Sequence, residues 1–420
     1  MQKKFDNIQA DPQWAFVQEK STSKWTHGYH RYPAKFLPNV VERLIELYHS
    51  QNDGVIADLF AGCGTTLVEA KAHGYASIGT DINPIAILIT RVKTTPIHPE
   101  RLLSEYNAFV EKFADYKSEA FIELRTHKRI DYWFEPENKY KIAFLYQCTN
   151  EIDDIELKEF FLVAISHILK NCSRWLQSST KPQIDKEKPI YDPFVEFEQH
   201  CEKMMRSNEQ FYAHIQKQHY ENVECQILER DARNTGIEAE SVDTIITSPP
   251  YVTSYEYADI HQLTGYWMEF FDNLALFRQK FIGTSYSGKM SLEVSGSKLA
   301  NSIISSLSKK DNRLARNVAT YFNDMQQVAE EMARILKPGG RACVVIGNTT
   351  LRNVEIKSSE VFYEFLCNAG LTEQDIIKRN IPHKLMPTLR DKTTGRFTTS
   401  DNENCKRVYP NEYIIIVQKP

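Results

Sequence analysis

The chain has 420 residues, of which 42% are hydrophobic and 25% charged, so it is long enough for one large globular domain with insertions or for two domains. Its net charge of −4 excludes a uniformly basic nucleic-acid coat but is compatible with a local basic face. Eight cysteines without a C-x-x-C pair disfavour a zinc ribbon or a disulfide framework. The sequence has no apolar signal core and no run of eighteen apolar residues, so we expect a soluble, cytoplasmic protein without a membrane partner.

The first predicted element is a βαβ unit at residues 54–87, GVIADLFAGCGTTLVEAKAHGYASIGTDINPIAI. Its strand-to-helix turn contains Gly62 and Gly64, which allow a sharp turn and let a ligand approach the free N–H groups of the helix. The third glycine of G-x-G-x-x-G is missing, which disfavours a nicotinamide dinucleotide. The turn predicts a site for another nucleoside cofactor, with a plain tight turn as the alternative.

Two acidic residues follow predicted strands of the same sheet. Asp81 comes about twenty residues after the glycine-rich turn, where a carboxylate can accept both hydroxyls of a ribose or cap the next helix. Asp231, in ERDARN, could accept a hydrogen bond from a purine amino group or cap the turn that follows. Both residues are therefore candidates for the cofactor site.

A helical insertion is predicted between these two motifs. Residues 95–220 have helical periodicity, clearest in EFFLVAISHILKNCSRWL, and a polar loop, SSTKPQIDKEKPIYDP. They are a candidate region for recognition of the DNA target, and they separate an N-terminal part, 1–94, from a C-terminal part, 221–420, which carries its own inserted basic segment at 255–320. Eight Lys or Arg against two acidic residues give the stretch 278–316 a local charge of +6.

The stretch SVDTIITSPPY predicts an apolar strand that ends in a stiff loop, Thr247 to Tyr251. At the carboxyl end of such a strand, the hydroxyl of Ser248 and a carbonyl, that of Pro249, could hold the hydrogens of a planar amine and aim its lone pair at an activated methyl group. Tyr251 could stack on the base that carries the amine. A proline-stiffened loop without a ligand is the alternative.

The last part of the chain predicts two further strands. In MARILKPGGRACVVIGN a helix is expected to stop at residues 337–340 and a strand to follow. The C-terminal EYIIIVQKP is expected to add one more strand to the sheet.

Taken together, DLFAGCGTT and TSPPY, with GTDINP and RDAR between them and LKPGGRACVVIGN after, resemble the S-adenosylmethionine-dependent amino-group DNA methyltransferases. The Ser-Pro-Pro-Tyr form resembles the members that make N4-methylcytosine, since adenine-N6 enzymes more often have Asp or Asn at the position of Ser248. The resemblance covers roughly residues 25–90 and 223–420. It implies an α/β fold, a Rossmann-like class I methyltransferase sheet that is mostly parallel with an antiparallel C-terminal strand, interrupted by the helical insertion.

The resemblance also implies site residues. The catalytic candidates are Ser248, Pro249, Pro250 and Tyr251. The segment HGYHRYPAKFLP, 27–38, is similar to one that closes over the methionine end of the cofactor, where Lys35 could pair with a carboxylate or remain an exposed lysine. The candidates for binding S-adenosylmethionine are Tyr32, Lys35, Asp58, Phe60, Ala61, Gly62, Gly64, Thr65, Asp81, Ile82, Asp231 and Ala232.

The implied activity is methyl transfer to N4 of cytosine in double-stranded DNA, in a prokaryotic cytoplasm at the nucleoid, by a monomer or homodimer with a restriction endonuclease as a candidate partner. Adenine-N6 methylation of DNA, guanine-N2 methylation of tRNA and a DNA-binding subunit with a relic fold are the alternatives. No Pro-Cys dipeptide occurs, which disfavours cytosine C5 chemistry, and no metal is expected. The basic stretches 278–316 and 378–396 are candidates for DNA contact, with solvated surface loops as the alternative.

Overall fold

The computed structural model describes most of the chain, and the statements below concern these residues. They are 2–17, 24–33, 35–49, 53–117, 127–179, 181–252, 257–284, 292–381, 389–393, 398–399, 401–407 and 411–420.

A seven-stranded sheet forms the centre of the molecule, in the order β3-β2-β1-β4-β5-β11-β8. Strand β11 runs antiparallel to both of its neighbours, whereas β3, β2, β1, β4 and β5 pair in parallel. This confirms the predicted α/β, Rossmann-like class I methyltransferase sheet with an antiparallel C-terminal strand. The strands are β1 (Ile56–Asp58), β2 (Ser77–Asp81), β3 (Cys225–Glu229), β4 (Val242–Thr247), β5 (Leu336–Ile346), β8 (Thr372–Asn380) and β11 (Asn411–Gln418).

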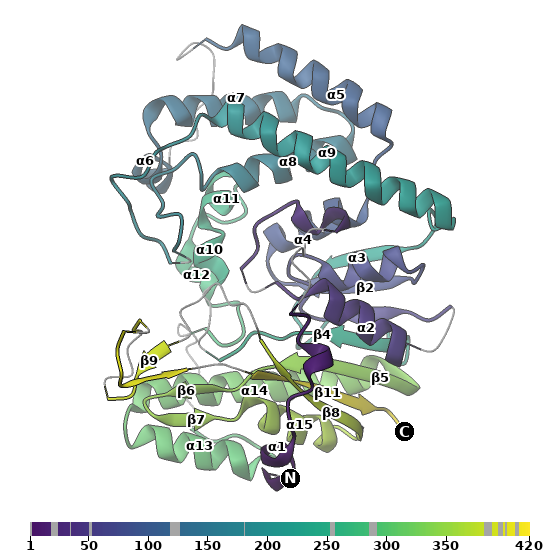
Figure 1. The fold of residues 1–420 in the computed structure, drawn as a ribbon, viewed down its shortest axis with the longest axis vertical. Helices are drawn as coiled ribbons and strands as arrows, with labels where there is room; N and C mark the ends of the chain where they lie inside the picture. The colour runs from purple at the N-terminus through teal and green to yellow at the C-terminus, as the bar shows by residue number, and fades with distance from the viewer. Residues whose placement is uncertain are drawn as a thin grey trace.

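Helices cover both faces of this sheet, which explains why its inner strands are apolar on both sides. Cys343 and Val345 of β5 pack in a cluster with residues of α2, whereas Val344 and Ile346 pack with residues of α14 and α15. The layers are visible in Figure 1, with α2 and α3 on one side of the strands and α14 and α15 on the other. The bounds are α2 (Pro38–Tyr48), α3 (Thr65–Ala72), α14 (Asn312–Ile335) and α15 (Ser358–Asn368).

The region predicted as an insertion is helical and forms the upper layer in Figure 1. Its helices are α5 (Pro99–Glu111), α6 (Lys128–Trp133), α7 (Pro136–Asn150), α8 (Ile155–Ile168) and α9 (Pro193–Gln218). Three short helices from much later in the chain complete the same hydrophobic cluster through side chains such as Trp267 and Phe277. These are α10 (Tyr257–Ile260), α11 (Gln262–Trp267) and α12 (Leu274–Arg278).

The stretch 337–340 differs from its prediction. Helix α14 ends at Ile335 and β5 already begins at Leu336, so the Lys-Pro-Gly-Gly sequence lies within the strand. Gly339 adopts a φ of 78° and its N–H donates to the Lys419 carbonyl, at 2.9 Å. The pairing of β5 with β4 shifts register here, so the glycines form a bulge in the strand and not a turn before it.

Of the remaining elements, α4 is a largely buried helix that packs against α8 and β3, and the others are short or lie at the periphery. Among the described residues, no helix combines the length and apolar character that crossing a bilayer requires. The elements are α1 (Gln2–Asn7), α4 (Pro84–Thr94), α13 (Lys298–Ser308), β6 (Thr349–Leu351), β7 (Val354–Ile356), β9 (Leu389–Asp391), β10 (Cys405–Arg407) and three 3-10 helices, Pro12–Trp14, Trp25–Gly28 and Lys112–Asp115.

Candidate active site

A cavity lies at the carboxyl ends of β1, β2 and β4, where ligands bind in open α/β sheets. It brings together residues that the sequence places far apart, including Asp58, Asp81, Asp231 and Ser248. The complete lining is Tyr32, Lys35, Phe36, Asp58, Leu59, Phe60, Ala61, Gly62, Cys63, Thr65, Asp81, Ile82, Arg230, Asp231, Ala232, Ser248, Pro250, Tyr257, Lys280, Phe281, Ile282 and Thr284.

Asp81 holds the glycine-rich turn against the end of β2. Its Oδ2 accepts from the Gly62 N–H and its Oδ1 from the Asn83 N–H, both at 2.9 Å. Asn83, and not Asp81, caps helix α4 with its side chain. Burial raises the pKa of Asp81 to about 6. The carboxylate therefore faces the cavity at a cost in hydration, which the two backbone donors partly offset.

Gly64 at the start of α3 cannot be replaced without strain. Its φ is +75°, and a Cβ at this position would lie 2.7 Å from Cγ2 of Thr90. The turn therefore delivers the first N–H groups of α3 to the cavity wall, the arrangement that favours a bound anion.

Asp58 connects the glycine-rich turn to the TSPPY loop. Its side chain is 2% exposed, and its Oδ1 accepts from the Phe60 N–H at 3.0 Å and from Oγ1 of Thr247 at 2.6 Å. Burial raises the pKa of Asp58, and the hydrogen bond from Thr247 acts against that rise. The ends of β1 and β4 are thus joined by one buried carboxyl group.

Three hydrogen bonds fix the TSPPY loop from behind. Ser248 Oγ donates to the Val345 carbonyl at 3.0 Å, Tyr321 Oη donates to the Pro250 carbonyl at 3.0 Å, and Tyr251 Oη donates to Oε2 of Glu412 at 2.8 Å. The Ser248 hydroxyl donates its one proton to Val345 and also lies within hydrogen-bond reach of the Tyr251 hydroxyl, so a lone pair is left to accept a further hydrogen bond. Within the described part of the chain, no donor meets the Pro249 carbonyl.

A family model described as a DNA methylase, of the N6/N4 type, matches residues 2–91 and 242–420, well over half of the chain. The chain belongs to this family. It is 26% identical over 400 residues to the Type II methyltransferase M.MvaI of Kocuria varians, which covers 89% of this chain and 88% of that protein. It is 24% identical to the Type II methyltransferase M.BsoBI of Geobacillus stearothermophilus, over 77% of this chain and 74% of that one.

A solved structure of an S-adenosylmethionine-dependent methyltransferase from Methanosarcina mazei also matches, at 10% identity and a TM-score of 0.31, and covers 90% of this chain and 96% of that one. As a member of the DNA methylase family, the 420-residue chain uses S-adenosylmethionine as its methyl donor and DNA as its substrate.

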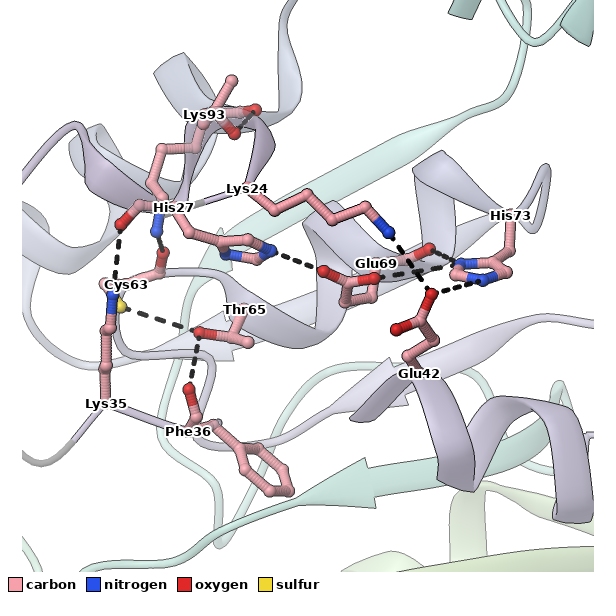
Figure 2. A network of polar contacts seen from close by, with 11 residues as sticks. Lys24, His27, Lys35, Phe36, Glu42, Cys63, Thr65, Glu69, His73 and Lys93 are labelled. Carbon is pink, nitrogen blue, oxygen red and sulfur yellow. Dashed lines mark hydrogen bonds and ion pairs between the residues drawn. The ribbon is translucent and has the colours of Figure 1, made fainter. Parts of the chain in front are cut away.

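Behind the glycine-rich turn, a buried polar network ties the N-terminal segment of the methyltransferase to α3 and α4 (Figure 2). The ammonium of Lys93 donates to the Cys63 carbonyl at 2.6 Å, and Oγ1 of Thr26 donates to the Lys93 carbonyl at 2.7 Å. His27 Nε2 lies 2.6 Å from Oε1 of Glu69. Burial lowers the pKa of His27 and raises that of Glu69 to about 8, so the interior favours the neutral forms of both.

A small cluster of possible metal ligands lies at the other end of α3 from the turn (Figure 2). Among the described residues, one possible ligand atom from each of Glu42, Glu69 and His73 lies within 4.8 Å of the other two. The ammonium of Lys24 lies 3.3 Å from Oε1 of Glu42 and already supplies a positive charge there.

Most of the residues predicted for the site line the cavity. Gly64, Pro249 and Tyr251 are the exceptions, because they support it from the next layer. His30 also lies behind the wall, with its Nε2 at 2.9 Å from the Ser166 hydroxyl on α8. Of the two tyrosines after the TSPPY loop that are candidates for the base pocket, Tyr257 lines the cavity and stacks on Tyr32 at 6.1 Å between ring centroids, whereas Tyr255 lies outside the described residues.

The wall formed by Lys280, Phe281, Ile282 and Thr284 was not predicted from the sequence as part of the cofactor cavity. These residues directly follow α12, on a segment that carries no motif, and they reach the cavity because α10 to α12 pack with the helical insertion. The one available signal was the aromatic content of residues 251–281. Apolar residues at the end of an inserted segment are more often core than ligand contacts, so the signal is weak.

The described residues of the stretch 278–316, a candidate for DNA contact, are spread over different parts of the molecule. Arg278 pairs with Asp259, Lys280 lines the cavity, and Lys309 is exposed beyond α13, at the opposite end of the molecule from the insertion (Figure 1). Its charges therefore divide between the cavity wall and a distant layer. Much of the second stretch, 378–396, lies outside the described residues.

Proposed function

We propose that this DNA methyltransferase transfers the methyl group to the N4 amino group of cytosine within a specific sequence of double-stranded DNA. The observation that carries the proposal is the pair of acceptors in the TSPPY loop, the hydroxyl of Ser248 and the carbonyl of Pro249. The hydroxyl is limited to accepting by its bond to Val345, and the Pro250 carbonyl is already occupied by Tyr321. We assign these two acceptors to the two hydrogens of an amino group: the Ser248 hydroxyl lines the cavity, and the Pro249 carbonyl lies in the layer next to it.

The cavity fits the methyl donor. Asp81 offers a carboxylate for ribose hydroxyls, the N–H groups at the start of α3 and the ammonium of Lys35 suit the carboxylate of the methionine part, and apolar side chains such as Phe60 and Phe281 suit an adenine ring. When bound, S-adenosylmethionine supplies an electrophilic methyl group. The residues we assign to it are Tyr32, Lys35, Asp58, Phe60, Ala61, Gly62, Gly64, Thr65, Asp81, Ile82, Asp231 and Ala232.

The two acceptors act on the reactivity of the target nitrogen. An exocyclic amine of a base is a poor nucleophile because its lone pair is delocalised into the ring. Hydrogen bonds from its two N–H groups to Ser248 and Pro249 favour a tetrahedral nitrogen and direct the lone pair along one line. The target base must leave the double helix to reach the loop, and we assign Tyr251, which lies in the layer next to the cavity, as its stacking partner. Bonding of the nitrogen to the methyl group would break the sulfur–methyl bond, release the donor as a neutral thioether and leave a cationic nitrogen, whose proton can pass to water, so neither acceptor needs to take up a charge.

Asp231 closes the turn after β3 and also lines the cavity. Its Oδ1 accepts from the Arg233 N–H at 2.9 Å, which closes the turn after β3, and the Arg233 guanidinium also holds the carboxylate. The residue still lines the cavity. We assign it to the adenine end of the cofactor, held in a fixed orientation by Arg233.

The relatives in curated collections carry the name Type II methyltransferase, and on this ground we place the chain in a restriction-modification system with a cognate endonuclease as partner. Methylation-aware sequencing of DNA from cells that express the wild type or the Ser248→Ala variant tests the proposal. We expect N4-methylcytosine at one recurring sequence in the first DNA and none in the second. N6-methyladenine in the DNA from wild-type cells would show that the target base is adenine and not cytosine.

A further inference from the structure

A buried ion pair lies directly behind the TSPPY loop, on the two antiparallel strands of the sheet. Arg379 of β8 and Glu412 of β11 are register partners, with 4% and 9% of their surface exposed. The Arg379 guanidinium bonds Oε1 of Glu412, and its Nε donates to the Trp14 carbonyl at 2.9 Å. The second oxygen of Glu412, Oε2, accepts from the hydroxyl of Tyr251 at 2.8 Å.

Stability alone does not account for this ion pair. Removing two charges from water costs about as much as their attraction returns, and apolar residues of similar size often serve equally well. A carboxylate held on one oxygen by Arg379 has its other oxygen fixed in direction. The acceptor for the Tyr251 hydroxyl is therefore rigid.

The ring of Tyr251 is also restricted along its edge. A Cβ on Gly347 would lie 2.7 Å from Cε2 of Tyr251, so the ring packs directly on the backbone at this glycine. Two residues earlier, the Val345 carbonyl accepts from Ser248. Both ends of the loop are thus held against the end of β5, and the Tyr251 contact also reaches β11.

We propose that Glu412, oriented by Arg379, is a positioning residue that sets the place of the TSPPY loop by holding the hydroxyl of Tyr251. Neither residue of the ion pair lines the cavity. The inference rests on the proposed function, because the position of this loop matters only if the loop holds the amine. It assigns a role to a buried pair in β8 and β11 that the methyl transfer itself does not use.

The primary test is Tyr251→Phe, which removes one hydroxyl and keeps the ring. Tyr363→Phe is the matched control, because the Tyr363 hydroxyl donates to Glu373 at 2.6 Å without touching the loop. Glu412→Gln is the second variant, and it leaves the buried Arg379 without its counter-charge. Each full-length variant is measured for kcat on whichever base the wild type methylates, for affinity for S-adenosylmethionine, and for amide hydrogen exchange of the peptide 244–252.

We expect Tyr251→Phe and Glu412→Gln to lower kcat about tenfold or more while cofactor affinity stays within about twofold, since a buried hydrogen bond to a charged group is lost at the acceptor loop only. Exchange in the loop peptide should become faster in both variants, and Tyr363→Phe should change neither quantity. Unchanged exchange in Tyr251→Phe overturns the inference whatever the activity, as does an unchanged kcat. A wild type that transfers no methyl group contradicts the proposed function instead, and the exchange comparison still decides the inference.

Discussion

The hydroxyl of Thr247 donates a 2.6 Å hydrogen bond to Oδ1 of Asp58, and this contact joins the last residue of β4 to the last residue of β1. Asp58 begins the glycine-rich turn and Thr247 begins the TSPPY loop. The cofactor side and the amine side of the cavity are therefore connected through one buried carboxyl group. In-line methyl transfer requires the two sides to be aligned, and such alignment is sensitive to small displacements.

Replacing Thr247 by Val should remove the hydrogen bond that connects the cofactor side of the cavity to the amine side, while keeping the shape of the side chain. The buried Asp58 carboxyl loses a donor, at a cost of about 1–3 kcal/mol in stability, and we expect kcat to fall about tenfold or more. Thr244→Val is the control, because the Thr244 hydroxyl bonds Nδ1 of His49 at 2.8 Å on the same strand, away from the cavity. Thermal melts and steady-state kinetics check both. If the two variants lose activity equally, the Thr247 contact has no special role.

Cofactor binding should weaken as the pH falls through about 6. Burial raises the pKa of Asp81 to about 6, and the protonated acid is a poorer acceptor for ribose hydroxyls. In the chain without cofactor, the stability linked to this raised pKa is fully present below about pH 4 and is lost as the pH rises through about 6.

Calorimetry with S-adenosylmethionine at pH 5 and pH 7 checks the effect of Asp81 on binding. The affinity at pH 5 should be about tenfold weaker, as one pH unit below the pKa implies. In Asp81→Asn the affinity should be low at both values. A wild-type affinity that is the same at pH 5 and pH 7 would contradict the role of the ionised carboxylate.

Lys93 should matter for cofactor affinity although it is fully buried behind the turn. Its ammonium holds the Cys63 carbonyl at 2.6 Å, so Lys93→Met leaves that carbonyl without its donor and loosens the glycine-rich turn. We expect an affinity about tenfold lower, which corresponds to about 1.4 kcal/mol. Lys71→Met removes a comparable bond, to the Val223 carbonyl at 3.3 Å, away from the turn. Calorimetry should find normal affinity in this control.

The sequence was most informative where one residue type has few explanations. Gly62 and Gly64 between a strand and a helix, and the prolines after β4, marked the two sides of the cavity because their backbone requirements are specific. The α/β sheet followed from the βαβ pattern, and its mostly parallel order with an antiparallel C-terminal strand followed from the family resemblance. For Asp81 and Asp231 the sequence allowed either a ligand contact or a cap. In the structure Asn83 caps α4 in place of Asp81, and Arg233 is the partner of Asp231.

Contacts between residues far apart in the chain could not be predicted from the sequence. Whether Trp267 and Phe277 pack with the sheet or with the insertion depends on a choice between two apolar cores, and their periodicity fits both. The pairing of Arg379 with Glu412 depends on the register of two strands more than thirty residues apart, since a shift by one residue reverses the faces. The bulge at Gly339 resembled a turn for the same reason, because its partner Lys419 is at the far end of the chain.

The central claim is that the TSPPY loop presents two acceptors to the N4 amine of cytosine. Its most direct test is mass spectrometry of nucleosides from duplex DNA incubated with S-adenosylmethionine and either the wild type or Ser248→Ala, with cofactor affinity measured in parallel. We predict N4-methylcytosine from the wild type and at least about a hundredfold less from the variant, at unchanged cofactor affinity. N6-methyladenine as the wild-type product, or full activity in Ser248→Ala, would contradict the claim.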